Sequence, residues 1–323
     1  MQFISDDQVR ACLSVSDVLP AMRSAFAALG RGHAANLGRS RVASTAWPSG
    51  RSLSVMGGIL PAGTVTADIL PAGNSVGRSV MGAKVYPTVE GRFNFIIPLF
   101  CADSGELLAV VQGNALTELR TAAVTLLAAE FLAMPKPHTL VVFGSGIQAR
   151  AHAIALCGHY PLQQVWVVDP HGNAGQLVAD LHSRFGVAAQ VSTAQEAVPQ
   201  AHLLVLATRA KDPLFPGEWV SPGTFVAAIG SSKPDTRETD DALLTRCACV
   251  VVEEKMQALR EAGDLVRASS QALNRDSVLE LGALVSGQTT WTRQPQDITL
   301  YKSVGIGLED VALARLVWEM LRE

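Results

Sequence analysis

The pattern of hydrophobic and polar positions changes along the chain. Ser5 and Gln8 have the spacing of a capping box, which predicts a short first helix. Residues 17–29 are apolar at intervals of three or four, and this period predicts a second helix. From about Asn36 to Phe100, short extended runs separated by Gly, Pro and Ser predict a small sheet joined by turns.

The period becomes helical again from Thr117 to Met134, and Pro135 closes that helix. Apolar runs then alternate with helical segments, which implies a parallel sheet with right-handed crossovers. Each run is nearly continuous, as expected for strands covered on both faces. The predicted strands are Thr139–Phe143, Gln164–Val168, Leu203–Ala207, Thr224–Ile229 and Val250–Val252. We interpret the last segment, Leu308–Leu321, as an amphipathic helix that packs back on the first domain.

Composition narrows the class of protein. The chain has 323 residues, 48% of them hydrophobic and 17% charged, which provides core for about two domains. A net charge of −3, with no run of Lys or Arg, disfavours a nucleic-acid partner. Five scattered cysteines without a CxxC pair argue against a structural metal, so we expect none, and free thiols favour a reducing compartment. No signal peptide or membrane span is evident, so we expect a cytoplasmic protein without a membrane partner.

The first predicted strand of the alternating series leads directly into a glycine turn. Gly144-Ser145-Gly146-Ile147-Gln148-Ala149 matches the G-x-G-x-x-A pattern between a strand and a helix. The first Gly permits the tight turn, the second lets the backbone approach a pyrophosphate, and Ala still allows close helix packing. We therefore predict an α/β protein with a Rossmann doubly wound parallel sheet and a smaller α+β domain.

Asp169 ends the second predicted strand of this series. A carboxylate there accepts hydrogen bonds from the ribose hydroxyls of a dinucleotide and repels a 2′-phosphate. NAD(H) is therefore the favoured cofactor, while the nearby His171 leaves NADP(H) as an alternative. An ordinary glycine turn followed by a surface Asp is the structural alternative to a dinucleotide site.

Several segments together resemble the ornithine cyclodeaminase/mu-crystallin family, in the family's order and over nearly the whole chain. They are Met81–Val85, Leu116–Ala123, the Gly144–Ala149 turn, Glu261–Leu265 and Tyr301–Gly305 followed by Glu309-Asp310. The resemblance implies a homodimeric enzyme that uses a nicotinamide dinucleotide on a small amino or imino acid. It also implies a discontinuous substrate-binding and dimerisation domain, 1–116 with 302–323, around a dinucleotide-binding domain, 117–301.

The resemblance also assigns site residues by position. Lys84 matches a substrate-contacting, catalytic lysine, and Arg120 matches the arginine that holds the substrate carboxylate, for which a guanidinium fork is suited. Arg39 matches a second substrate arginine, although Arg41 lies two residues away. Val304 matches a residue beside nicotinamide and substrate. The dinucleotide set is Gly144, Ser145, Gly146, Ile147, Gln148, Asp169, Thr208, Gly230 and Ser303. Each of these residues also has a structural interpretation, as a surface, turn or cap residue.

The sequence departs from the cyclodeaminases at their two acidic positions. Their catalytic Asp is matched by Ser232, and a second acidic residue is matched by Ser54. A serine hydroxyl lacks carboxylate basicity near neutral pH, so Ser232 cannot take the same proton. Asp235 is a candidate replacement, or a simple turn residue after Pro234. The segment instead resembles that of the family's ketimine reductases, which act on cyclic imino acids such as Δ1-pyrroline-2-carboxylate.

Three functions remain open. The first is an NAD(P)H-dependent reduction of a small 2-imino or 2-oxo acid by hydride transfer. The second is a cyclodeaminase that uses NAD catalytically, with Ser232 as the feature against it. The third is a non-enzymatic dinucleotide-binding protein of the crystallin type, against which the retention of Lys84 and Arg120 weighs.

Overall fold

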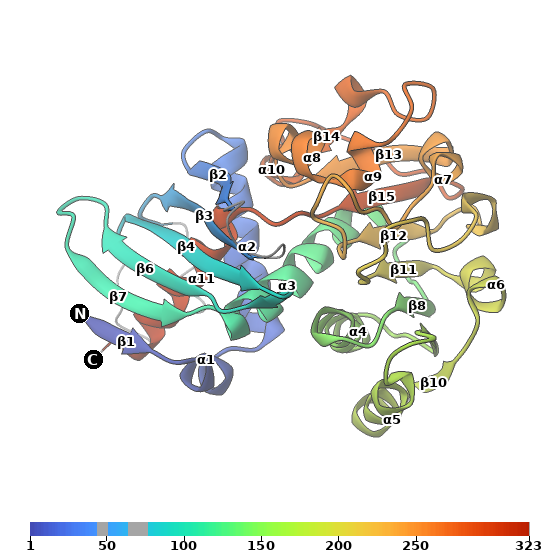
Figure 1. Ribbon diagram of the computed structural model, residues 1–323, viewed down its shortest axis with the longest axis horizontal. Coiled ribbons are helices and arrows are strands. Elements are labelled where there is room, and N and C mark those ends of the chain that lie inside the picture. The colour runs from blue at the N-terminus through green and yellow to red at the C-terminus, as the bar shows by residue number, and fades with distance from the viewer. Residues whose placement is uncertain (44–50, 64–76, 323) are drawn as a thin grey trace. The chain divides into compact units, whose positions relative to one another are not determined.

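The structure, a computed structural model, describes residues 1–43, 51–63 and 77–322, so residues 44–50 and 64–76 of the predicted small sheet lie outside it. The chain divides into two compact units (Figure 1). Unit 1 comprises Met1–Val124, Val285–Thr289 and Gly305–Glu323. Unit 2 comprises Thr125–Leu284 and Thr290–Val304. Ser303 and Val304 thus belong to unit 2, whereas the boundary expected from the sequence places them with the first domain.

Unit 1 contains a mostly antiparallel sheet of the order β1-β7-β6-β4-β3-β2, with β5 paired to β4. Among the described strands of this sheet, only β1 is parallel to its neighbour, β7. Gly105, with a φ of +74°, lies in the turn between β6 and β7. The strands are β1 Gln2–Ile4, β2 Ala35–Val42, β3 Arg51–Leu60, β4 Val80–Val89, β5 Arg92–Phe93, β6 Ile96–Cys101 and β7 Leu107–Gln112.

The predicted N-terminal helices of unit 1 are present. The amide of Gln8 donates to the Ser5 hydroxyl at 3.3 Å, and the amide of Ser5 donates to the Gln8 side chain at 3.0 Å, which completes the capping box. The helices are α1 Asp6–Cys12, α2 Val15–Gly30, α3 Asn114–Leu132, which continues into unit 2, and α11 Gly307–Leu321. Helix α11 packs on β2, β3, β4 and β6 and against α2 (Figure 1).

The interpretation of the last helix as amphipathic is wrong. Every residue of α11 from Gly307 to Glu319 is buried, including the charged side chains of Glu309, Asp310, Arg315 and Glu319. Buried charges require partners. Arg315 and Glu319 pair with each other at 3.0 Å, and Glu309 and Asp310 pair with cations elsewhere in unit 1. The polar positions of α11 therefore face the protein interior.

Unit 2 contains an eight-stranded parallel sheet of the order β10-β9-β8-β11-β12-β15-β13-β14. The order reverses at β8, whose neighbours β9 and β11 lie on opposite sides of it. The prediction of a doubly wound parallel sheet with a second domain is confirmed. The strands are β8 Thr139–Phe143, β9 Gln164–Val168, β10 Ala188–Val191, β11 Leu203–Leu206, β12 Phe225–Ala228, β13 Cys247–Val252, β14 Leu279–Glu280 and β15 Ile298–Lys302.

Helices and turns connect these strands. Within the described residues, the α-helices of unit 2 besides α3 are α4 Ile147–His159, α5 Ala174–Phe185, α6 Ala194–Ala197, α7 Asp241–Arg246, α8 Lys255–Glu261, α9 Gly263–Val266 and α10 Leu281–Ser286. The sequence pattern misses β10, β14 and β15. Strand β15 has a structural consequence, because it inserts between β12 and β13 and places Ser303 at the carboxyl edge of the sheet.

The described residues contain no single helix of the length and apolarity needed to cross a membrane. Helices α1 and α2 pass that test only when taken together, and they are bent by 97° at their junction.

Candidate functional site

The glycine turn lies between β8 and α4, at the carboxyl edge of the parallel sheet beside the point where the strand order reverses. Gly144 has a φ of +96°, and a Cβ on it would lie 2.9 Å from the carbonyl oxygen of Ala207. Gly146 has an ordinary φ of −72°, and a Cβ there would meet nothing within 4 Å. Ala149 is buried, with its Cβ 3.7 Å from the ideal Cβ position of Gly144. The turn thus has a tight first glycine, open space at the second and close packing at the third position.

This geometry fits a pyrophosphate. The first turn of a helix presents backbone N–H groups without intrahelical partners, and the helix dipole favours an anion there. Ile147, the first residue of α4, is 70% exposed, so the end of the helix is accessible. A side chain on Gly146 would fill open space beside the turn, the space that phosphate oxygens would need.

Asp169 follows β9 and lies directly beside the glycine turn. Its carboxylate accepts a hydrogen bond from the Ser145 hydroxyl at 2.6 Å and one from the backbone N–H of His171 at 3.1 Å. Partial burial opposes its ionisation, but these bonds outweigh burial and hold the pKa of Asp169 below its ordinary value. A Cβ at Gly172 would collide with the same carboxylate. Asp169 is therefore an ionised acceptor held at the turn.

A buried carboxylate, Glu238, ties together the ends of β11 and β12. It accepts hydrogen bonds from the amide and hydroxyl of Thr208, both at 2.8 Å, and from the amides of Gly230 at 2.8 Å and Ser231 at 3.2 Å. Burial is the largest influence on Glu238 and raises the pKa of its carboxyl, against the opposing charge of Lys302. Thr208 and Gly230, both predicted to contact the dinucleotide, are therefore held by the same carboxylate, that of Glu238.

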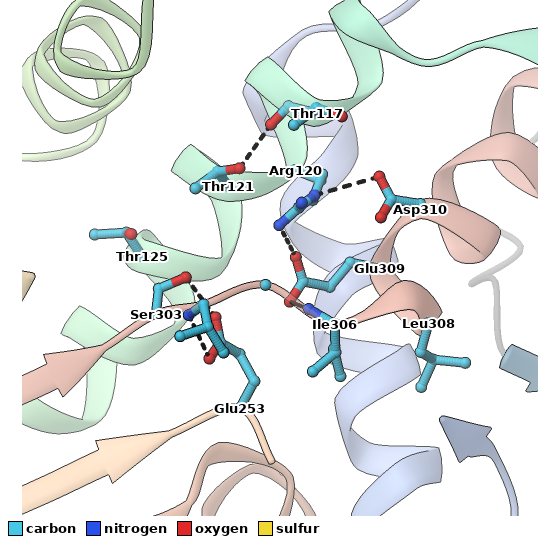
Figure 2. A network of polar contacts seen from close by, with 12 residues as sticks. Thr117, Arg120, Thr121, Thr125, Glu253, Ser303, Ile306, Leu308, Glu309 and Asp310 are labelled. Carbon is cyan, nitrogen blue, oxygen red and sulfur yellow. Dashed lines mark hydrogen bonds and ion pairs between the residues drawn. The ribbon is translucent and has the colours of Figure 1, made fainter. Parts of the chain in front are cut away.

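A second buried carboxylate, Glu253, connects the ends of β13 and β15 through hydrogen bonds (Figure 2). The Ser303 hydroxyl and the Tyr301 hydroxyl donate to this carboxylate, the latter at 3.0 Å, and the Val304 amide donates to it at 3.2 Å. Ser303 and Val304 are thereby fixed in unit 2 at the same edge of the sheet as the glycine turn.

Ser232, which matches the position of the cyclodeaminase Asp, and its candidate replacement Asp235 lie on the loop after Gly230. Ser232 is partly buried, and Asp235 is exposed next to Pro234. The neighbouring Ser231 hydroxyl donates to the carbonyl oxygen of Thr236 at 2.5 Å, which closes this loop. The structure places both Ser232 and Asp235 in unit 2, on the loop that Glu238 anchors.

The predicted substrate residues of unit 1 lie on the face of its sheet that α11 covers, which we call the inner face, near the start of α11. Lys84, on β4, is 2% exposed. Its ammonium lies 2.8 Å and 2.9 Å from the two carboxylate oxygens of Asp310, and 3.5 Å from the hydroxyl of Thr117 on α3. Burial lowers the pKa of Lys84 and Asp310 raises it, so that it lies at about 8. Lys84 can therefore exchange a proton near neutral pH.

Arg120, on α3, is held by two consecutive carboxylates (Figure 2). Its Nη1 donates to Glu309 at 2.5 Å, and its Nε lies 3.4 Å from Asp310. Gly305, with a φ of +73°, packs against the guanidinium, because a Cβ there would lie 2.7 Å from Nη1. The Nη2 of Arg39, on β2, donates to the carbonyl oxygen of Gly305 at 3.4 Å. The structure thus brings Lys84, Arg120 and Arg39 together within unit 1.

Ser54 lies on β3 and faces the same inner side of the sheet. It is fully buried and accepts a hydrogen bond from the Nε of Arg41 at 3.1 Å. The position that is acidic in cyclodeaminases is therefore occupied here by a hydroxyl beside a guanidinium. Such a pair disfavours a cationic substrate group and accommodates an anion or a hydrogen-bond acceptor.

Sequence reasoning missed most of the residues that organise these sites. Glu309 and Asp310 stand in a segment used for the resemblance, but no role is assigned to them from the sequence. The two aromatic rings beside Lys84 are also missed. The ammonium of Lys84 lies 4.8 Å from the ring centroid of Phe95 and 5.9 Å from that of Tyr86. The available signal for the two carboxylates is the presence of adjacent acids at the start of a mostly apolar terminal helix.

Comparison with known proteins matches nearly the whole chain to one protein family. The sequence profile of the ornithine cyclodeaminase/mu-crystallin family matches residues 2–323. The ketimine reductase mu-crystallin of Rattus norvegicus is 31% identical over 326 residues, covering 98% of this chain and 96% of the relative. A Delta(1)-pyrroline-2-carboxylate reductase of Bacillus cereus is 31% identical over 265 residues, covering 79% of this chain and 81% of the relative.

A solved structure also matches nearly the whole chain. The probable ornithine cyclodeaminase from Bordetella pertussis Tohama I has a TM-score of 0.88 and 38% sequence identity, and covers 98% of this chain and 96% of its own.

Proposed function

Because the chain belongs to the ornithine cyclodeaminase/mu-crystallin family, we propose that it reduces a small 2-imino acid to an amino acid with a nicotinamide dinucleotide. A 2-oxo acid would be a substrate together with ammonia or an amine, which condenses with it to the imine and releases water. The favoured substrate class is a ketimine such as Δ1-pyrroline-2-carboxylate. Relatives that are 31% identical are named ketimine reductase and Delta(1)-pyrroline-2-carboxylate reductase, which supports this class.

The observation that carries the proposal is the buried pair of cations in unit 1. Lys84 and Arg120 are 2% and 5% exposed and have distinct chemical capacities. A guanidinium holds a carboxylate through parallel hydrogen bonds but does not release a proton. An ammonium with a pKa of about 8 can release one. We assign Arg120, with Arg39, to the substrate carboxylate, and Lys84 to orientation of the substrate and proton transfer at its nitrogen.

The dinucleotide, when bound, supplies the hydride. In unit 2 we assign the pyrophosphate to Gly144–Gln148, the adenosine ribose to Asp169, and further contacts to Thr208, Gly230 and Ser303, with Val304 beside the nicotinamide. The ionised state of Asp169 supports NAD(H) over NADP(H), since a 2′-phosphate would meet a like charge. Ser232 and Asp235 remain candidates for a polar contact with the substrate.

A cyclodeaminase is the alternative, and the likeness to the Bordetella pertussis protein favours it. That reaction starts from an amino acid with a cationic side chain, such as ornithine. Ser232 lacks the carboxylate that takes a proton in cyclodeaminases. Arg41 beside Ser54 puts positive charge at the other position that is acidic in those enzymes. Both features support the reductase.

We also propose that the protein is a homodimer formed through the outer face of the unit 1 sheet. Large apolar side chains of one face are 41–65% exposed there: Phe3, Leu37, Val42, Leu53, Ile59, Val89 and Ile96. A contiguous apolar face of this kind typically covers a partner surface. The five free cysteines support a reducing compartment, and we propose the cytoplasm.

A reductase assay tests the function. Purified protein is mixed with NADH, or separately NADPH, and with Δ1-pyrroline-2-carboxylate or pyruvate plus methylamine, and the loss of reduced-cofactor absorbance is followed. Turnover with NADH supports the proposal. Release of ammonia from ornithine with NAD and no net NADH, in the absence of reductase turnover, would instead establish the cyclodeaminase.

The variant Lys84→Met tests the role assigned to Lys84. It keeps an unbranched side chain of similar length and removes the ammonium. We expect reductase turnover to be lost while dinucleotide binding, measured by NADH fluorescence, is retained. Unchanged turnover would remove Lys84 from the proposed proton transfer.

A further inference from the structure

Two adjacent carboxylates at the start of α11 divide their contacts between the two cations. Glu309 accepts from Arg120 Nη1 and also from the backbone N–H of Ile306 at 3.2 Å, which fixes it to the first turn of the helix (Figure 2). Asp310 contacts Lys84 through both oxygens and reaches Arg120 Nε at 3.4 Å. Both acids therefore contact Arg120, but of the two only Asp310 contacts Lys84.

Asp310 is placed to control the charge of Lys84. Both side chains are almost completely buried, at 0% and 2% exposure, so water screens their interaction little. Among the described residues, the uncharged groups that face Lys84 are the hydroxyl of Thr117 and the rings of Tyr86 and Phe95. None of these is a carboxylate.

The remaining charges around Lys84 oppose its protonation. Arg120 and Arg39 both lower the pKa of Lys84, in addition to the larger lowering by burial. Asp310 raises it through its charge and its hydrogen bond. Without Asp310, burial and the two guanidinium groups would together lower the pKa of Lys84 further and favour the neutral amine.

We propose that Asp310 is a positioning residue that keeps Lys84 protonated and directs its ammonium, so that Lys84 donates a proton to the substrate nitrogen, while Glu309 separately orients Arg120. In this step an N–H bond of the ammonium breaks, the substrate nitrogen gains the proton, and the neutral amine recovers a proton from water. The inference rests on the proposed function for the substrate, but the state of Lys84 can be measured without turnover.

The direct test titrates Lys84 by NMR. The chain has six lysines, so protein labelled with ¹³C at lysine Cε gives few signals, and Lys84→Arg identifies that of Lys84. In the wild type we expect Lys84 to be charged at pH 7 and to titrate below an ordinary lysine. A neutral Lys84 at pH 7 in the wild type would overturn the inference, whatever the outcome of the reductase assay.

Two matched variants then separate the roles of the acids. Asp310→Asn keeps the shape and removes the charge, and we expect the titration of Lys84 to move down by at least one pH unit. Glu309→Gln is the control, since it changes the neighbouring acid and should shift Lys84 much less. Equal titration of Lys84 in Asp310→Asn and wild type would contradict the proposal.

The pH profile of reduction provides a readout that a structural role alone would not move. For the wild type, kcat/KM should fall as pH rises through the pKa of Lys84. In Asp310→Asn this fall should begin at least one unit lower, with a loss of about fivefold or more at pH 8 and a smaller loss at pH 6. The same substrate is used throughout, so its own ionisation does not differ between variants.

Asp310→Glu is the conservative comparison. It retains the charge, so the position of the alkaline fall should stay near that of the wild type even if kcat decreases. A pH-independent loss of the same size in both variants would show that Asp310 serves packing alone.

Discussion

The two glycines of the turn after β8 should respond in opposite ways to the same substitution. Gly144 has a φ of +96°, and a Cβ on it would lie 2.9 Å from the backbone oxygen of Ala207. Gly146 has φ −72° and ψ −176°, which any residue adopts, and its missing Cβ would enter open space. Gly144→Ala should therefore damage folding, and Gly146→Ala should damage dinucleotide binding.

The magnitudes follow from these geometries. A left-handed backbone costs a residue with a Cβ about 1–2 kcal/mol, and the close approach to Ala207 adds to it, so Gly144→Ala should destabilise by about 1–3 kcal/mol. At Gly146, the loss of an N-terminal cap preference and the reduced freedom of the unfolded chain oppose each other, leaving a change within about 1 kcal/mol. A methyl group in the proposed pyrophosphate space should weaken binding by about 1–3 kcal/mol, or roughly 5- to 150-fold in Kd.

Urea unfolding measures the first quantity, and titration of NADH fluorescence with the folded variants measures the second. Each variant is the control for the other, because both add one methyl group within the same turn. The assignment of this turn to a pyrophosphate would be refuted if Gly146→Ala folded normally and bound NADH with the affinity of the wild type.

Three further predictions concern other parts of the molecule. Asp169→Ser should raise kcat/KM for NADPH relative to NADH by about tenfold or more, since it removes the charge that repels a 2′-phosphate; an unchanged ratio would place cofactor choice elsewhere. Glu319→Gln should lower the free energy of unfolding, measured with urea, by about 3–5 kcal/mol, because it leaves the fully buried Arg315 guanidinium without its carboxylate. Replacing Arg315 by Met and Glu319 by Leu together should lower it less. Equal losses of stability in the two proteins would argue against a dominant role of the ion pair. Ile59→Lys, on the outer sheet face, should shift sedimentation towards the monomer, and a dimer of unaltered affinity would locate the interface on another surface.

The dinucleotide half of the candidate site follows largely from local sequence. Strands β8 and β9 have the bounds that their apolar runs predict, because a parallel strand covered on both faces must be apolar along its length. The glycine turn is also a local requirement, since one backbone conformation excludes a Cβ at Gly144. Asp169 then lies beside that turn because the carboxyl ends of parallel strands share one edge of the sheet.

The order of strands in the sheet was decided only by tertiary packing. Strand β15 follows β14 in the chain but lies between β12 and β13, and its run Ile298–Lys302 was not predicted as a strand. Hydrogen bonding between strands depends on which segments meet in space, and no periodicity along one segment records its neighbours. The position of Ser303 therefore came from the resemblance, and its anchor on Glu253 came from the structure alone.

The polar face attributed to α11 illustrates the same limit. A pattern of charged and apolar residues predicts a solvent-exposed side, because isolated charges are costly to bury. In unit 1, partners distant in sequence remove that cost: Lys84 and Asp310 are separated by 226 positions and meet at 2.9 Å. The sequence by itself determined which residue types carry the chemistry and where the dinucleotide turn lies. Only the tertiary structure decided that Lys84 and Arg120 are buried and that adjacent acids hold them, because those states depend on charges brought together by folding.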